Sequence, residues 1–187
     1  MAFFEWIQSI DISAVRLIRE YLSCGFLDFI MPVVTLLGEA GIVPIVISLS
    51  MMCFKKTRKA GFVMALAILF GFIVGNLTLK PLVARPRPYT VDTDVVLLID
   101  KLKEYSFPSG HTLVTFECAL SLVFSGYRRV GTFATIMAFV VAFSRVYLYV
   151  HYPTDVIFGA ILGSLFAYLA YVLVNAIYRK VQKSETL

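Results

Sequence analysis

The segment "SRVYLYVHYPTD", residues 144–155, places an arginine, a histidine and an aspartate between two long apolar runs. His151 and Asp155 are four residues apart and flank Pro153, where the last apolar run begins. An aspartate in that position can orient one imidazole nitrogen and leave the other free to attack an electrophile. The spacing therefore predicts a histidine nucleophile supported by a carboxylate, with Arg145 close to it.

A second group of candidate residues lies in "FPSGHT", residues 107–112. Pro108 is suited to a first helical turn, so we expect a helix to start here with Ser109, Gly110 and His111 at its beginning. Free backbone N–H groups at such a start bind anions, and Gly110 lets a ligand approach the backbone closely.

A third group lies in "KPLVARPRP", where Pro86 and Pro88 are expected to hold the chain extended around Lys80, Arg85 and Arg87. These three groups together would supply fixed cations, a helix N-terminus and two histidines. Such a set favours the binding of an anion that has several oxygens and gains charge during reaction. Phosphate has these properties. One histidine would attack phosphorus and the second would protonate the leaving oxygen.

Composition places these groups in a membrane protein of one domain, residues 1–187. The chain is 59% hydrophobic and 16% charged, with a mean hydropathy of +0.84. The net charge of +5 is a weak hint of nucleic-acid binding, but in a membrane chain it more often reflects basic cytoplasmic loops, so no nucleic-acid partner is expected.

Three scattered cysteines argue against a disulfide framework and are interpreted as small apolar fillers: Cys24, Cys53 and Cys118.

Apolar runs predict an all-α integral membrane bundle of about five transmembrane helices. Residues 60–79 and 156–178 are uncharged, and each matches the ~20 residues that a span requires. Residues 27–54 form a longer but weaker span, interrupted by Pro32, Glu39 and Pro44. Two shorter runs, 112–126 and 130–143, reach spanning length when polar residues at one end are included. Two GxxxG patterns indicate close helix contacts: Gly71 with Gly75, and Gly159 with Gly163.

The N-terminal segment, residues 1–23, carries five charges among its apolar residues and is a poor span. An amphipathic helix in the membrane interface, with Trp6 at headgroup level, is the favoured interpretation. It would bring the total to six helices. A helix packed on the bundle is nearly as well supported.

Charges in the connections predict the orientation. Basic segments at residues 55–59, 127–129 and 178–183 alternate with the remaining connections, so five spans place all three on one side. The positive-inside rule makes that side cytoplasmic, and the three groups of candidate residues then meet on the outer face.

Other polar residues are interpreted individually. For Arg85, an exposed position or a contact with lipid headgroups is at least as well supported as a catalytic role. Glu117 lies inside a span and is interpreted as making a structural hydrogen bond, whereas Glu39 has no predicted role. Three tyrosines are interpreted as aromatic residues of the membrane interface: Tyr147, Tyr149 and Tyr152.

The three groups together resemble the signatures of the type 2 phosphatidic acid phosphatase family of membrane lipid phosphatases. The first is Lys80 followed after six residues by Arg87 and Pro88, and the second is "PSGH" at 108–111. The third is Ser144-Arg145, five residues, His151, three residues and Asp155. The resemblance covers residues 80–155. It implies a helical bundle, often of six spans, that uses neither metal nor cofactor.

The resemblance also implies roles. His151 would be the nucleophile that forms a phosphohistidine, Asp155 its support, and His111 the acid for the leaving group. The residues that would bind the phosphoryl oxygens are Lys80, Arg87, Ser109, Gly110 and Arg145. The partners implied are the bilayer and a lipid phosphate substrate that enters laterally.

Several alternatives stay open or are disfavoured. A transporter would place its charges near mid-membrane on broken helices, whereas here they gather at one face. Three nearby cations would repel a divalent metal, although Asp92, Asp94 and the histidines are metal-ligating types. Transfer of phosphate between lipids remains open, as does the choice among undecaprenyl pyrophosphate, phosphatidylglycerol phosphate and phosphatidic acid. The compact length is typical of bacterial members, which predicts the bacterial plasma membrane with an extracytoplasmic site. The oligomeric state is not predicted.

Overall fold

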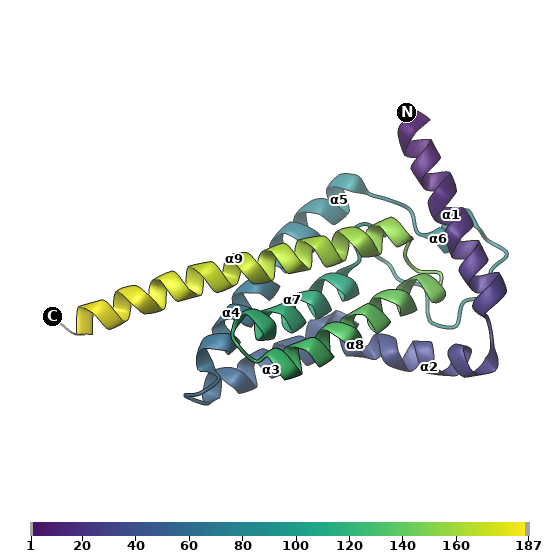
Figure 1. Ribbon diagram of the computed structural model, residues 1–187. Coiled ribbons are helices and arrows are strands. Elements are labelled where there is room, and N and C mark those ends of the chain that lie inside the picture. Colours follow the sequence, from purple (N-terminus) through teal and green to yellow (C-terminus); the bar gives the residue numbers. More distant parts are fainter. Residues whose placement is uncertain (1, 186–187) are drawn as a thin grey trace.

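The computed structural model describes residues 2–185, and every regular element in that range is a helix. Helix α7 (Gly110–Phe124) runs through the middle of the bundle and packs against α4 (Arg58–Gly71), α8 (Arg128–Tyr147) and α9 (Pro153–Glu185) (Figure 1). Most side chains of α7 are buried, although it begins with the polar pair Gly110–His111. This start of α7 lies at one end of an otherwise apolar bundle, and the candidate functional residues gather at that end.

Within residues 2–185, three segments are each long and apolar enough to cross a membrane: Arg58–Val91, Arg128–Tyr147 and Pro153–Ser184. The first combines α4, the π-helical segment η2 (Phe72–Leu79) and the short helices α5 (Lys80–Val83) and α6 (Pro88–Val91). Helix α7 is apolar but shorter than the others. The all-helical membrane bundle predicted from hydropathy is confirmed. About five spans were predicted, whereas the described residues contain three such segments, or four when the bent pair Gly25–Glu39 and Ile42–Cys53 counts as one span.

The first predicted span is broken. Residues 27–54 form α2 (Gly25–Thr35), the 3-10 helix η1 (Leu36–Gly41) and α3 (Ile42–Cys53), and the two α-helices are bent by 46°. Gly41 has a φ of +68°, a conformation that glycine adopts without the strain other residues suffer. The break lies at Glu39, one of the three residues that interrupt this run in the sequence, and it turns η1 toward the start of α7.

Glycines bring α7 close to its neighbours on two sides. A Cβ atom at Gly163 would lie 2.5 Å from the carbonyl oxygen of Leu113, and one at Gly71 would lie 2.1 Å from Oε1 of Glu117. No side chain larger than hydrogen fits at these positions without displacing a neighbour. The close contacts predicted from the two GxxxG patterns are confirmed.

Helix α1 (Ala2–Leu22) crosses the end of the bundle at a steep angle to α9 (Figure 1). Asp11 and Val15 are buried against the bundle, whereas Trp6 is 60% exposed and Leu17 is 53% exposed. The helix therefore packs on the bundle and also presents a separate apolar surface to its surroundings. It combines features of both interpretations of the N-terminal segment.

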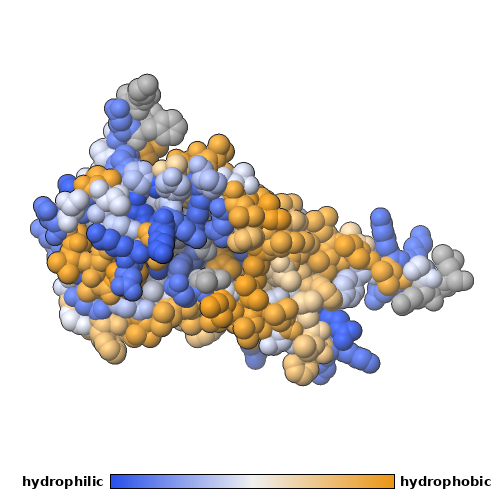
Figure 2. All heavy atoms as spheres, turned by 180° about the vertical axis from the view of Figure 1, so that it is seen from behind, coloured by the Kyte–Doolittle hydropathy of each residue, from blue (hydrophilic) through white to orange (hydrophobic). Residues whose placement is uncertain are grey.

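The surface is polar at its two ends and apolar between them (Figure 2). The predicted basic segments meet at one end: Tyr127 donates to the carbonyl of Lys56 at 2.7 Å, and the Lys59 ammonium lies 5.6 Å from the ring centre of Tyr178. The candidate residues lie at the opposite end. The predicted grouping of the basic segments is confirmed.

The interpretations of the tyrosines and of two cysteines are wrong. Tyr147, Tyr149 and Tyr152 are almost completely buried, because α1, α2 and the segment before α7 cover them. The hydroxyls of the first two donate to Asp28 and Asp92, both at 2.7 Å. Of the three cysteines, Cys118 is buried and fills apolar space, whereas Cys24 and Cys53 are exposed.

Candidate active site

A cavity of ≈ 550 Å³ opens between η1, η2, α7 and the segments around residues 104 and 151. Six of the eight predicted site residues line it: Lys80, Arg87, Gly110, His111, Arg145 and His151. Ser109 and Asp155 are fully buried directly beside these residues. The structure thus brings together side chains that are up to 75 positions apart in the sequence (155 − 80).

His151 lies in the short connection between α8 and α9 and is 2% exposed. Its Nδ1 atom is 3.5 Å from Oδ2 of Asp155, and its Nε2 atom is 3.2 Å from Nη1 of Arg87. A guanidinium can only donate, so Nε2 accepts and carries the lone pair, while Nδ1 carries the proton that faces Asp155. Burial lowers the pKa of His151 from 6.5 to about 3, with the nearby charges of Arg87 and Arg145 adding to the effect. The imidazole is therefore neutral at neutral pH, and its Nε2 lone pair accepts from Arg87, which lines the same cavity.

Asp155 occupies the first turn of α9, and several donors fix its carboxylate. Oδ2 accepts from the Ser106 hydroxyl at 2.5 Å and from the backbone N–H of Tyr152 at 3.0 Å. Oδ1 accepts from Nη1 of Arg85 at 2.6 Å. Ser106 also lies 3.4 Å from Nδ1 of His151, so it touches both members of the pair. No spacing pattern marks Ser106 in the sequence, and it was missed.

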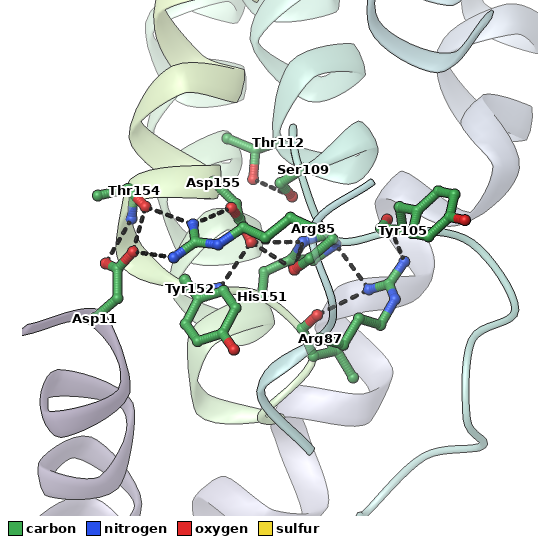
Figure 3. A network of polar contacts seen from close by, with 12 residues as sticks. Asp11, Arg85, Arg87, Tyr105, Ser109, Thr112, His151, Tyr152, Thr154 and Asp155 are labelled. Atoms are coloured by element: carbon green, nitrogen blue, oxygen red, sulfur yellow. Dashed lines mark hydrogen bonds and ion pairs between the residues drawn. The ribbon is translucent and has the colours of Figure 1, made fainter. Parts of the chain in front are cut away.

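Arg85 is not exposed as predicted. Its side chain is 13% exposed and forms ion pairs with both Asp11 of α1 and Asp155 of α9 (Figure 3). The prediction failed because it considered only the local segment "VARPRP", whereas both carboxylates come from distant elements.

Arg87 is held by backbone carbonyls. It donates to the carbonyl oxygens of Val150 at 2.8 Å, Glu104 at 2.7 Å and Tyr105 at 3.2 Å (Figure 3). Neutral carbonyls orient the guanidinium without neutralising its charge. Arg87 therefore remains available to bind an anion beside Nε2 of His151.

Arg145 is 1% exposed and lines the cavity. Nη1 donates to the Thr35 hydroxyl, while Nε and Nη2 have no hydrogen-bond partner in the part of the chain that is described. Unpaired buried donors are costly, so these atoms mark a place where acceptor oxygens would be stabilised. A buried arginine of this kind does not serve as a membrane-surface anchor.

Lys80 forms an ion pair with Glu104, whose side chain is 67% exposed. This hydrogen bond holds the pKa of Glu104 below its usual value. The sequence did not identify Glu104, because a glutamate in the charged stretch "DKLKEY" is indistinguishable from any surface residue.

Helix α7 begins at Gly110, so Pro108 lies just before the helix instead of in its first turn, as had been predicted. The Ser109 N–H donates to the carbonyl of Asp155 at 3.1 Å, which joins the start of α7 to the start of α9. A Cβ atom at Gly110 would lie 3.4 Å from Oδ1 of Asn76 and 3.7 Å from Nζ of Lys80. The predicted helix start is present, and both of these contacts are at ordinary van der Waals distance.

His111 faces η1, where its Nε2 atom lies 3.2 Å from Oε2 of Glu39. A Cβ atom at Gly38 would be 3.0 Å from the imidazole ring, so this glycine allows η1 to approach. Glu39, which had no predicted role, is thus a partner of a predicted catalytic residue. An isolated glutamate between Gly38 and Gly41 in an apolar run was the available signal.

Glu117 does not make the predicted hydrogen bond. It is fully buried against Gly71, and neither carboxyl oxygen has a hydrogen-bond partner of normal geometry within residues 2–185.

Within residues 2–185, no three His, Cys, Asp or Glu side chains gather in a way that could hold a metal ion.

Fold and site define an α-helical membrane protein with a cavity at one end of its bundle that is lined by buried, positively charged side chains. The chain belongs to the PAP2 superfamily, whose family model matches residues 57–179.

Relatives and solved structures agree with this assignment. The chain is 34% identical over 120 residues to an undecaprenyl-diphosphatase of Sulfolobus acidocaldarius, covering 64% of this chain but only 58% of that protein. It is 30% identical over 165 residues to the bacitracin transport permease protein BcrC of Bacillus licheniformis, covering 84% and 77%. Among structures, Aquifex aeolicus LpxE gives a TM-score of 0.76 at 28% identity, covering 86% of this chain and 94% of that one. The PAP2-type phosphatidylglycerolphosphate phosphatase of Bacillus subtilis gives 0.71 at 30% identity, covering 94% and 87%.

Proposed function

We propose that this protein is a membrane phosphatase that hydrolyses a lipid phosphomonoester or lipid pyrophosphate through a phosphohistidine. One observation carries the proposal: the lone pair of His151 Nε2 points at the uncompensated guanidinium of Arg87, while its Nδ1 proton faces Asp155. A phosphoryl group bound by Arg87 would lie directly in front of the nucleophile. The names of similar proteins, an undecaprenyl-diphosphatase and a phosphatidylglycerolphosphate phosphatase, support the choice of a lipid substrate.

In the first step, Nε2 of His151 forms a bond to phosphorus and the bond from phosphorus to the leaving oxygen breaks. His111 donates a proton to that oxygen, which departs on the lipid. Positive charge develops on the imidazole, and the Asp155 carboxylate stabilises it through the Nδ1 proton.

The phosphoryl oxygens gain charge in this step and require donors. Arg145 supplies Nε and Nη2, which are buried and unpaired, and Arg87 supplies a guanidinium whose other partners are neutral carbonyls. Lys80, the N–H groups at the start of α7 and Ser109 complete the proposed set. Donors fixed in a buried site stabilise a transition state without reorganising, which is commonly the largest contribution to catalysis.

In the second step, water attacks the phosphohistidine while His111 accepts one of its protons. Inorganic phosphate leaves and His151 is regenerated.

We also propose an orientation and a location for the protein. By the positive-inside rule, the end of the bundle that carries this site faces the extracytoplasmic side, and the membrane is the plasma membrane.

The function is tested by measuring phosphate release by the purified protein in detergent. The panel contains undecaprenyl pyrophosphate, phosphatidylglycerol phosphate and phosphatidic acid, with the His151→Ala variant as the control. Release from at least one lipid by the wild type alone is expected. Absence of release from every lipid, or equal release by the variant, would refute the proposal.

A further inference from the structure

Helix α1 places a buried carboxylate against the start of α9. Asp11 is 2% exposed, and its Oδ1 atom accepts from the backbone N–H of Thr154 at 3.2 Å. Oδ2 accepts from the Thr154 hydroxyl and, at 2.6 Å, from Nη2 of Arg85. The first turn of a helix has N–H groups without intrahelical partners and favours negative charge, so Asp11 stabilises the start of α9 from outside that helix.

Arg85 connects this carboxylate to Asp155. Its two terminal nitrogens donate in different directions, Nη2 to Asp11 and Nη1 to Oδ1 of Asp155, each at 2.6 Å. The guanidinium also lies over the ring of Tyr152, 3.9 Å from its centre, which limits its movement. Figure 3 shows Arg85 between α1 on one side and the Asp155–His151 pair on the other.

The chain of contacts continues to the nucleophile. With Oδ1 engaged by Arg85, Oδ2 of Asp155 faces the Ser106 hydroxyl and Nδ1 of His151. One arginine between two carboxylates leaves one net negative charge in the group of three. If Asp11 were neutral, Arg85 would compensate Asp155 alone, and less negative charge would remain to support the imidazole.

We propose that Asp11, acting through Arg85, is a positioning residue for the Asp155–His151 pair. Helix α1 thus contributes a residue on which the activity of the site depends. This inference rests on the proposed phosphatase function. Removing the charge of Asp11 weakens the stabilisation of the positive imidazole in the transition state, while the phosphate-binding donors stay in place. The loss therefore falls on kcat and leaves KM nearly unchanged.

The test compares Asp11→Asn with Arg16→Gln in the full-length protein in detergent. Arg16 lies on the same helix and pairs with Asp92 at 2.7 Å, but it is largely exposed and neither residue contacts Asp155 or His151. The control thus weakens the attachment of α1 without interrupting the chain of contacts. Thermal unfolding midpoints measured on both variants show whether each one is folded.

We expect Asp11→Asn to lower kcat by about 10- to 100-fold, the scale of one charge-assisted hydrogen bond, with KM changed less than about twofold. Asp11→Glu, which restores the charge, should recover part of this loss, and Arg16→Gln should keep wild-type kcat. The ¹⁵N spectrum of the His151 imidazole should show a smaller fraction of the Nδ1–H tautomer in Asp11→Asn than in the wild type.

Wild-type kcat in Asp11→Asn would overturn the inference, as would an equal loss in Arg16→Gln or a loss that only follows the fraction of unfolded protein. Failure of the function itself gives a different result, since the wild type would then release no phosphate from any lipid. The tautomer measurement does not depend on turnover. An unchanged spectrum in Asp11→Asn would refute the positioning role even in that case.

Discussion

Nη1 of Arg87 lies 3.2 Å from Nε2 of His151, and this contact fixes the orientation of the imidazole. The guanidinium requires an acceptor, which fixes the lone pair on Nε2 and the proton on Nδ1. The same nitrogen of Arg87 also donates to the carbonyl of Val150, the residue directly before His151. The proposed nucleophile and the proposed anion-binding residue therefore occupy fixed positions relative to each other.

The two histidines should respond differently to the leaving group. His151→Ala removes the atom that attacks phosphorus and should abolish turnover of every substrate. His111→Ala removes the proposed acid, and general acid catalysis contributes ~10²–10⁴-fold, so turnover of a lipid phosphomonoester should fall by about that factor. An activated aryl phosphate, whose leaving group needs no proton, should recover much of the deficit in formation of the phosphoenzyme.

Rapid quenching with ³²P-labelled substrate checks this assignment. An acid-labile, base-stable adduct should form in the wild type and in His111→Ala. Its formation in His151→Ala, or recovery of that variant by the activated substrate, would mean that the two roles are reversed.

The helices and the three signature groups could be predicted from the sequence because each depends on local properties. Hydropathy marks the spans, and a proline beside a change from polar to apolar residues marks the start of α9. The supporting contacts could not be predicted in this way. Arg85 and Asp155 are 70 positions apart, and Glu39 and His111 are 72 apart. Such pairs depend on how the helices pack and on the break at η1.

The tyrosines illustrate the same limit. An aromatic residue at the end of a span suits the membrane interface and a buried cluster equally well. Tyr149 is buried because α1 and the segment after α6 cover it, and its hydroxyl finds Asp92 there. Which elements cover a position is a property of the tertiary fold.

The pH dependence of stability should reflect the buried nucleophile. Burial lowers the pKa of His151 from 6.5 to about 3, so between these values the unfolded chain binds a proton that the folded protein does not. The contribution of the neutral imidazole is therefore complete above pH 6.5 and is lost progressively as the pH falls toward 3. Thermal unfolding midpoints at pH 7 and pH 4.5 should fall more in the wild type than in His151→Gln. Equal decreases would contradict the lowered pKa.

Chelation should leave activity nearly intact. Arg87 and Arg145 supply the positive charge that a metal ion would otherwise provide, and they occupy the cavity beside both histidines. Vanadate, which can adopt the trigonal-bipyramidal geometry of a phosphoryl group in transfer, should inhibit. The measurement is phosphate release with EDTA, with EDTA followed by Mg²⁺, and with vanadate. Loss of activity in EDTA and its return with Mg²⁺ would exclude this mechanism.

The proposed orientation places Lys59 and Arg129 in the cytoplasm and Asp94 outside, because the basic segments gather at one end of the bundle and the site lies at the other. Single cysteines at these three positions, in a variant whose native cysteines are replaced, can be probed in intact cells with an impermeant thiol reagent. Labelling at 94 alone is expected. The reverse pattern would place the site on the cytoplasmic face.

Glu39 should matter through His111 and therefore only when the leaving group needs a proton. Its Oε2 atom lies 3.2 Å from Nε2 of His111, and a carboxylate at this distance both orients the imidazole and stabilises its protonated form. Glu39→Gln keeps the size of the side chain and removes the charge. We expect kcat for a lipid phosphomonoester to fall by about tenfold, the scale of one charge-assisted hydrogen bond, and kcat for the activated aryl phosphate to change little.

Asp94→Asn is the matched control, since it also removes one carboxylate but lies on the exposed surface outside the cavity. It should leave both substrates unaffected. In the double variant Glu39→Gln/His111→Ala, loss of Glu39 should cost almost nothing further, because its partner is already absent. An additive loss, or an equal decrease with both substrates in Glu39→Gln alone, would show that Glu39 acts on something other than the acid.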